Sequence, residues 1–349
     1  IAGFNFWGSR VNAGKADGNK LLDIQRWGDL KLTGGAATDV GQAFRECISL
    51  SLISANDGPW LPVRLNFPSL NSHGCRGLFS SCINLVTVNN IVNWDVSNCN
   101  SIEIMFSGCT KFQFGSAASG IIDLSKWEVG NIFRFERTFM GCSAMNAKMF
   151  TSVGGNSAAF PSNVQIDFQQ MFKNCISFDS YSDGSMVNWD TTEASNMSEM
   201  FSNCNIFNEN ISSWDTGKVT TMRSMFTQCA VFNHPISSWD TSNVIDMRRM
   251  LEGTLAFDQP IGSWNVNAWN TVAVGDTPLT SGSAFSLSTA NYDALLLAWD
   301  AAYTFPSWPG GTVDFGSSQY SLTSPGNAVA AARTSLANKW GTLNDGGGI

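Results

Sequence analysis

Charged residues and histidine are both scarce in this sequence. Lys, Arg, Asp and Glu make up only 14% of the 349 residues, against about a quarter in an average globular domain. We therefore expect Ser, Thr, Asn and Gly to cover much of the surface. The formal net charge of -8 disfavours a nucleic-acid partner, because phosphate binding needs a basic patch or stripe. The only two histidines, His73 and His234, disfavour a mixed Cys/His metal site.

Long apolar runs, leader signals and catalytic motifs are also missing. No run of about 20 apolar residues occurs, so we expect no membrane insertion. The chain starts at Ile1 without a signal-peptide pattern, which suggests a processed product or one part of a longer protein. No G-x-S-x-G, Walker or H-E-x-x-H motif is present. We therefore predict no enzyme, no catalytic residues, no resident metal and no cofactor; an enzyme would need a polar pocket with a perturbed acid or base.

What the sequence does contain is an internal repeat. Trp189, Trp214, Trp239 and Trp264 are each 25 residues apart, and a Met-Phe-x-x-Cys motif recurs between them. We number each copy from the Phe of this motif, as position 0. The eight residues at position 0 are Phe44, Phe79, Phe106, Phe139, Phe172, Phe201, Phe226 and Leu251. Large apolar residues recur at positions -12, -4 and +6, and Cys at +3. Such self-similarity indicates a solenoid, in which each copy covers the apolar face of its neighbour.

Each copy is predicted to contain one helix and one short strand. Val244, Met247, Met250 and Leu251 follow the i, i+3, i+6, i+7 spacing of a single helical face, which predicts about three helical turns. Thr216 and Thr241 are candidate N-caps, and an extended piece such as residues 232–236 follows. The predicted fold is an α/β solenoid that is leucine-rich-repeat-like: eight stacked strand-helix repeats with terminal caps.

The predicted domain boundaries follow the ends of the repeat. Residues 1–31 form an N-terminal cap, 32–264 the repeat solenoid, and 265–349 a C-terminal α/β cap or, alternatively, a separate small domain. In the last region we predict helices at 290–299 and at 324–338. Strands are predicted at 312–315 and 339–343.

All nine cysteines occupy positions that the repeat predicts to face inward. Seven lie at +3, whereas Cys75 takes position -4 and Cys99 takes position -7. Free Cys behaves as a small buried hydrophobe, and no paired C-x-x-C spacing of a zinc site occurs. We predict a ladder of reduced thiols, with disulfides or a metal site as the alternatives.

Two further recurring residues each allow two interpretations. An Asp follows the repeat Trp in four copies, at Asp95, Asp190, Asp215 and Asp240. These carboxylates either accept backbone N–H groups in turns, which we favour, or bind Ca²⁺. The Trp residues themselves either lie half-buried on a ridge, which we favour, or form a carbohydrate-stacking stripe.

Inserts between copies all fall between position +6 and the next position -12, and therefore on one edge of a solenoid. The longest include residues 51–66 and 113–126. Aromatic residues outside the repeat pattern are candidates for recognition, because aromatics and Arg are enriched at interfaces. The candidate binding residues are Trp60, Arg64, Phe114, Tyr181, Trp269 and Trp308.

The repeat resembles a known family. Residues 211–216, with Val219, Met222, Met225-Phe226 and Cys229 and then residues 232–236, are similar to the repeat of BspA-like leucine-rich repeat surface proteins of bacteria. Residues 20–28 resemble the segment that opens such arrays, and residues 291–299 and 314–321 resemble segments that close them. The long inserts in the first five copies, and Thr254 in place of Cys, depart from the pattern. The resemblance implies display on a surface and binding to host molecules or other cells, without catalytic residues; related arrays occur in phage proteins.

Together these observations predict a non-enzymatic, extracellular adhesion module on a bacterial cell or a phage fibre. Its partner would be a protein or glycan of a host or cell surface, bound through one edge of the solenoid. The alternative is a structural spacer or assembly subunit that contacts copies of itself. Nine unpaired thiols favour folding in a reducing cytosol before display, as on a virion.

Overall fold

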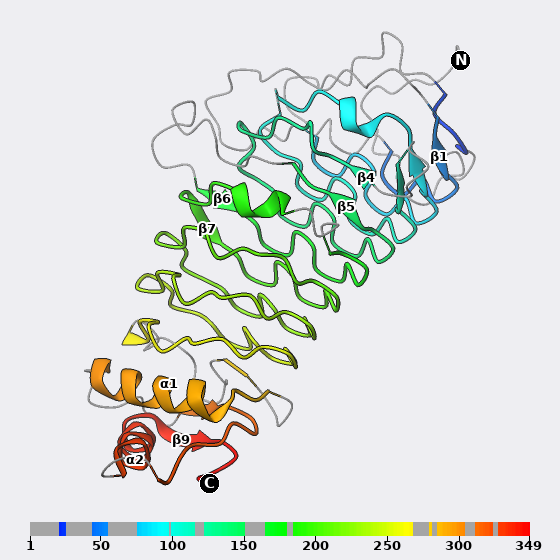
Figure 1. The fold of residues 1–349 in the computed structure, drawn as a ribbon. Helices are drawn as coiled ribbons and strands as arrows, with labels where there is room; N and C mark the ends of the chain where they lie inside the picture. Colours follow the sequence, from blue (N-terminus) through cyan, green and yellow to red (C-terminus); the bar gives the residue numbers. More distant parts are fainter. Residues whose placement is uncertain are drawn as a thin grey trace. The chain divides into compact units, whose positions relative to one another are not determined.

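The computed structural model describes eleven stretches of the chain, which carry all eight copies of position 0 (Figure 1). They are residues 21–25, 44–54, 75–97, 99–115, 122–150, 165–179, 184–267, 279–280, 285–303, 311–323 and 327–349. The chain divides into two compact units, Ile1–Trp189 and Asp190–Ile349. Position 0 of copies one to five lies in the first unit, and that of copies six to eight in the second. The domain boundaries after residues 31 and 264 stay predictions.

Regular secondary structure in the first unit consists of very short elements. Its strands are β1 (Leu52–Ile53), β2 (Thr87–Val88), β3 (Phe114–Gly115), β4 (Ile122–Asp123), β5 (Ala147–Lys148) and β6 (Ile166–Asp167). Its 3-10 helices are η3 (Ile91–Asn93) and η6 (Ser185–Asn188). Strands β1, β2 and β3 pair in parallel, with Leu52 opposite Thr87 and Thr87 opposite Phe114; β4 pairs with β5 in the same sense. The first three strands occupy the same place in successive copies, so neighbouring copies lie one strand spacing apart.

The second unit contains one short strand in copy six and longer elements that follow the last copy of the repeat. They are β7 (Ala194–Asn196), α1 (Thr289–Ala302), β8 (Gly311–Asp314), α2 (Ala328–Trp340) and β9 (Gly341–Asn344). Helix α1 is capped by the Ser288 side chain, which accepts the Asn291 N–H, as the Ser-Thr pair predicts. Strands β8 and β9 pair in parallel. The second predicted helix is corrected: α2 continues to Trp340 and ends at Gly341, so the last strand begins at 341 instead of 339.

Position -5 forms a second parallel ladder within each unit. In the first unit Ser101 pairs with Arg134, and Arg134 with Asp167. In the second unit Asn196 pairs with Thr221, and Thr221 with Asp246. Between positions -5 and +2, every second backbone N–H donates to a carbonyl of the next copy. In copy three, for example, the N–H groups of Ile104 and Phe106 donate to carbonyls of copy four at 2.9 Å. The backbone polar groups of one copy are thus satisfied by its neighbour, as in a parallel sheet.

The predicted repeat helix is wrong. Residues 248–251 form turns, Asp246 lies in a β-bridge, and within the described parts of the copies no residue is assigned to an α-helix. Positions -2 and +2 have left-handed φ angles, for example 59° at Ile104 and 77° at Gly108, and each reverses the chain before a second helical bond can form. The intervening bonds span three residues, such as the Met105 N–H to the Ile102 carbonyl, 3.1 Å. Consecutive turns therefore produce the three-residue apolar spacing that a helix would also show.

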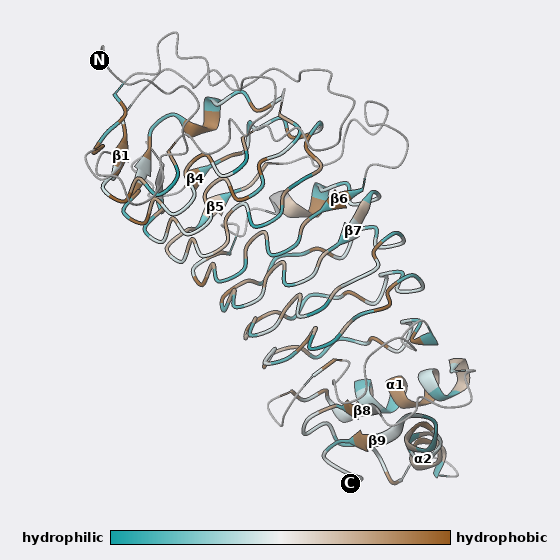
Figure 2. Ribbon diagram, turned by 180° about the vertical axis from the view of Figure 1, so that it is seen from behind, coloured by the Kyte–Doolittle hydropathy of each residue, from teal (hydrophilic) through white to brown (hydrophobic). Residues whose placement is uncertain are grey.

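The core of each unit is built from stacked identical side chains. Rings at position 0 stack on those of the next copy, with centroids 5.4 Å apart for Phe44–Phe79 and 5.9 Å for Phe106–Phe139. In the second unit the Phe201–Phe226 separation is 5.8 Å. Figure 2 shows hydrophobic and hydrophilic residues alternating along the turns of the repeats. The apolar positions that the sequence predicts therefore form a continuous core inside each unit.

The repeat tryptophans lie deeper than predicted. Trp94, Trp127 and Trp239 are only 2–3% exposed, so they are neither half-buried ridge residues nor an accessible carbohydrate platform. Two of these indole N–H groups donate to carbonyls of the preceding copy: Trp127 Nε1 is 2.7 Å from the Ile91 oxygen, and Trp239 Nε1 is 3.2 Å from the Ile211 oxygen. Full burial is tolerated because this bond satisfies the one polar atom of the ring.

The nine cysteines are all buried, which confirms that they occupy inward-facing positions. The Sγ of a +3 cysteine donates to the carbonyl of position 0 in the preceding copy, as in Cys82 to Phe44 at 3.0 Å and Cys142 to Phe106 at 3.1 Å. Thr254, the one exception at this position, donates its hydroxyl to the Leu251 carbonyl at 2.7 Å. The position therefore requires a small side chain with a hydrogen-bond donor.

The C-terminal segment packs directly on copy eight. Asp258 accepts the Ser288 N–H at 2.8 Å, and the Asn291 side chain donates to Asp258 at 2.8 Å. A Cβ added to Gly262 would meet the Ala298 Cβ at 3.2 Å, so α1 approaches this turn closely. Copy eight and α1 thus share one core.

Candidate functional site: the ladder face

In each unit the polar side chains at positions -5, -3, -2, +1 and +2 form a surface that we call the ladder face. Seven of the eleven arginines of the chain lie at these positions, although the net charge is -8. They are Arg45, Arg76, Arg134 and Arg137 in the first unit, and Arg223, Arg248 and Arg249 in the second. Guanidinium groups bind carboxylates and planar polar groups through two parallel hydrogen bonds, so their concentration here makes this face the strongest candidate for recognition.

A short turn fixes the backbone beneath these side chains. The residue at -5 accepts the N–H of the residue at -3, as in Asp167 to Gln169 at 2.8 Å and Asn196 to Ser198 at 3.0 Å. Asp246 makes the same bond to the Arg248 N–H at 3.1 Å. Asp and Asn favour this turn because their side chains reach the backbone two residues on. The turn holds position -3 in the same conformation in successive copies.

In the first unit the ladder face carries a network of ion pairs centred on Glu103. Arg76 Nε lies 3.0 Å from Glu103 Oε1, and Arg134 Nη1 lies 3.8 Å from Oε2. Glu103 is only 4% exposed, so its two partners offset much of the cost of burying the carboxylate. Burial, reinforced by the Glu103 and Asp167 carboxylates, raises the pKa of the neighbouring Glu136. This network joins copies two, three and four.

In the second unit Asp246 holds Arg248 through two bonds. Arg248 Nε is 2.9 Å from Asp246 Oδ1, and Nη2 is 2.7 Å from Oδ2. Partial burial raises the pKa of Asp246, but the Arg248 bonds and the charge of Arg223 outweigh it, and the net pKa lies below the ordinary value. Arg249 Nε lies 3.7 Å from Glu252, with its side chain 53% exposed, and Arg223 is exposed. These two exposed guanidinium groups are available to a partner.

Five of the six predicted binding residues lie outside the described residues: Trp60, Arg64, Tyr181, Trp269 and Trp308. The backbone of the sixth, Phe114, lies in strand β3, opposite Thr87, and not in an irregular insert. The ladder-face arginines were missed, although the sequence carries their signal. Arg recurs at position -3 in copies two, seven and eight, which an inspection of the polar positions would have found.

The Asp residues that follow the repeat Trp act as turn residues, as favoured. Asp95, Asp190 and Asp240 each accept the N–H two residues on, at 3.0, 3.1 and 2.8 Å, and Asn265 does the same at 3.0 Å. The predicted N-cap role of Thr216 and Thr241 is wrong, since their hydroxyls donate to carbonyls of the next copy, at 2.9 and 3.2 Å.

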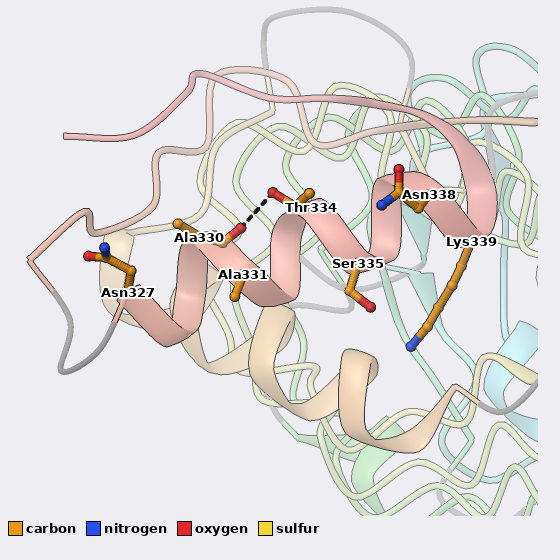
Figure 3. A pocket seen from close by; sticks show the side chains of 7 residues that line it. All are labelled: Asn327, Ala330, Ala331, Thr334, Ser335, Asn338 and Lys339. Atoms are coloured by element: carbon orange, nitrogen blue, oxygen red, sulfur yellow. Dashed lines mark hydrogen bonds between the residues drawn. The ribbon is translucent and has the colours of Figure 1, made fainter.

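A shallow hollow on the outer face of α2 has little chemistry to offer (Figure 3). It is lined by Asn327, Ala330, Ala331, Thr334, Ser335, Asn338 and Lys339. Its one charged group, the Lys339 ammonium, already lies 2.7 Å from Asp300 Oδ1, and Thr334 bonds to its own helix at Ala330.

Neither α1 nor α2, the helices in the part of the chain that the structure describes, has the length and hydrophobicity of a membrane span.

No curated protein and no solved structure matches the chain. One family does, over residues 73–183 and again over residues 166–275. The two matches follow the repeat from copy two to the end of copy eight and cover more than half of the 349 residues. The chain therefore belongs to the family described as Mycoplasma protein of unknown function, DUF285.

Proposed function

We propose that this chain is a non-enzymatic binding module, displayed extracellularly, that recognises a protein or glycan partner through its repeats. On this proposal the fold is a repeat solenoid related to BspA-like leucine-rich repeat surface proteins, with turns in place of repeat helices. The ladder face supplies the contacts, together with the insert edge that bears Trp60 and Arg64. The surface that carries the module is a bacterial cell or a phage fibre.

One observation carries the proposal: the core positions of the repeat are nearly constant, whereas the polar positions of the ladder face vary. Position 0 is Phe in seven of eight copies, and +3 is Cys in the same seven. Position -3, on the same turns, is Arg, Glu, Glu, Gln, Ser, Arg and Arg from copy two to copy eight. A scaffold that keeps its core and varies its exposed side chains can present a specific pattern of donors and acceptors, as repeat proteins do on their binding surfaces.

The test is binding of the fluorescently labelled chain to bacterial and epithelial cells, measured by flow cytometry. Parallel samples of cells are treated with protease, which removes protein receptors, or with periodate, which destroys glycans. We expect saturable binding that one of the two treatments abolishes. Absence of saturable binding to every cell type would contradict the proposal.

A charge-reversal pair tests the role of the ladder face. Arg223→Glu with Arg249→Glu should weaken binding at least tenfold, because an Arg-to-carboxylate contact becomes a repulsion. Lys218→Glu is the matched control: its side chain is also 53% exposed, but it lies at position -8, outside the ladder face. Equal losses in both variants would indicate a general charge effect and remove the ladder face from the proposal.

The alternative, a structural subunit that contacts copies of itself, has one observation in its favour. Ile206, Val231 and Leu255 follow position +3 in successive copies of the second unit and are 45%, 43% and 61% exposed. Exposed apolar residues in a row suit contact between protein surfaces. Sedimentation of the chain would decide: concentration-dependent association together with absent cell binding would favour the assembly function.

A further inference from the structure

The two cysteines outside the thiol ladder meet in space. Cys75 takes position -4, which holds Met, Val, Ile or Phe in the other copies, and Cys99 takes position -7, where copies four, seven and eight have Ile or Val. These two departures from the repeat are 24 residues apart in the chain, yet their sulfur atoms lie 3.0 Å from each other. Both side chains are buried, at 2% and 1% exposure.

The surrounding backbone holds the pair in place. The Cys75 N–H donates to the Ser101 carbonyl at 2.9 Å, and the Gly77 N–H to the Glu103 carbonyl at 2.8 Å. These bonds place Cys75 beside Ser101 of the next copy, two residues after Cys99. By contrast, Cys82, Cys109 and Cys142 each direct Sγ to a backbone carbonyl. The off-ladder pair is thus distinguished from the ladder by its hydrogen-bond partner.

We propose that Cys75 and Cys99 are a disulfide-forming pair, which closes when the chain folds in, or is transferred to, an oxidising environment. The oxidant class is a small-molecule disulfide. One cysteine thiolate attacks oxidised glutathione and expels one glutathione thiolate. The second cysteine thiolate then attacks the protein sulfur of the mixed disulfide and expels the other. One S–S bond forms as one breaks, the two cysteines are oxidised, and oxidised glutathione is reduced to two glutathione molecules, which take up the two protons.

We expect the disulfide to form mainly while the chain folds, before the two thiols are enclosed. The bond to Cys99, and burial, raise the pKa of Cys75 well above its ordinary value, so little thiolate is present once the pair is enclosed. The same enclosure protects the disulfide after it has formed. The bond would fasten copy two to copy three, and it would leave seven reduced cysteines in the ladder.

The experiment is oxidative refolding followed by peptide mapping. The reduced, full-length chain is refolded in oxidised and reduced glutathione; free thiols are alkylated, and the digest is analysed without reduction by mass spectrometry. We expect a peptide that links Cys75 to Cys99 and seven alkylated cysteines. The oxidised chain should melt roughly 6 °C above the reduced chain, because the bond closes a loop of this length in the unfolded state.

Matched variants separate this pair from the ladder. Cys75→Val and Cys99→Val use a residue that the same positions hold in other copies, so they should fold while losing both the link and the redox-dependent melting shift. Cys109→Thr copies the residue of copy eight at +3 and should keep both. Alkylation of all nine cysteines in the refolded wild-type chain, or links among ladder cysteines, would overturn the proposal.

Discussion

At the scale of single residues, the protein depends on backbone conformations that most side chains avoid. Ile104 and Arg137 have φ angles of 59° and 54° at position -2, although a β-branched or bulky residue rarely adopts them. Each such residue costs about 1–2 kcal/mol, which the bonds of its neighbours to the next copy must offset. Position +2 relieves this strain with glycine in three of the copies, at Gly108, Gly141 and Gly253.

Gly141→Ala tests the left-handed conformation. Gly141 has a φ of 76°, and an added Cβ would meet only the backbone of Gly108 at 3.7 Å, so there is room for the methyl group. We expect a loss of about 1 kcal/mol in the free energy of unfolding, from backbone strain alone. Chemical denaturation measures it. The control is Gln228→Gly, at position +2 of copy seven in the second unit. It should change the free energy of unfolding by less than about 0.5 kcal/mol, because the released backbone strain and the added entropy of the unfolded chain oppose each other. A neutral Gly141→Ala would contradict the assigned conformation.

Asp258→Asn tests how much one carboxylate charge contributes to a series of bonds in which a side chain accepts a backbone N–H from the following segment. Asn233 accepts the Asp258 N–H at 2.9 Å, and Asp258 in turn accepts the Ser288 N–H. Partial burial opposes ionisation, but the bonds from Asn291 and Ser288 prevail, so the pKa of Asp258 lies below its ordinary value of 3.8. A carboxyl group with a lowered folded pKa stabilises the protein at neutral pH, and this contribution disappears as the pH falls below about 4.

Asn at this position can still accept the Ser288 N–H, as Asn233 does for Asp258. The variant should therefore melt within a few degrees of the wild type at pH 7. It should also lose less stability than the wild type between pH 5 and pH 3, as thermal melting across that range would show. Parallel melting curves at every pH would mean that the Asp258 charge contributes nothing.

At the scale of elements, the repeat unit is a series of turns and α1 is the largest regular element that covers it. The helix buries Tyr292, Leu295, Leu296 and Trp299, and the Trp299 ring meets Trp340 of α2 edge-on, with centroids 5.9 Å apart. Its approach depends on Gly262, which stands where copies six and seven have Ser212 and Ser237. Without a side chain at 262, the backbones can come within contact of Ala294 and Ala298.

Gly262→Val should loosen the packing of α1 on copy eight. The added Cβ would lie 3.2 Å from the Ala298 Cβ and 3.3 Å from the Ala294 carbonyl, so the helix must shift. Such overpacking costs about 1–3 kcal/mol, which differential scanning calorimetry would detect as a lower melting temperature. Ser237→Ala, at the same position one copy earlier, is the control and should melt like the wild type. An unchanged melting temperature for Gly262→Val would show that α1 does not rest on this turn.

At the scale of the whole molecule, stability and recognition occupy different positions of the same repeat. The inward positions carry stacked Phe, Trp, Met and Cys, and they tolerate little change because each side chain contacts its equivalents in neighbouring copies. The ladder-face positions contact solvent and one another, so they can differ from copy to copy. This division is what allows a chain with only 14% charged residues to concentrate arginine on one surface, and it underlies the proposed binding function.

The sequence by itself determined the repeat period, the position of every copy, and which residues face the core. Those features follow from apolar spacing, which is the same whatever backbone joins the apolar residues. The turn role of Asp95 and Asp240 and the cap at Ser288 were also predictable, because these bonds reach only a few residues along the chain.

Only the tertiary structure decided the conformation of the repeat and the surface that it presents. Turns replace helices because alternate N–H groups, such as that of Ile104, find carbonyls in the next copy, and no local propensity encodes a partner about 30 residues away. The same stacking buries Trp94 completely, places the arginines of neighbouring copies along the ladder face of each unit, and brings Cys75 to Cys99. Each of these outcomes depends on which copies become neighbours, and that is a property of the folded chain.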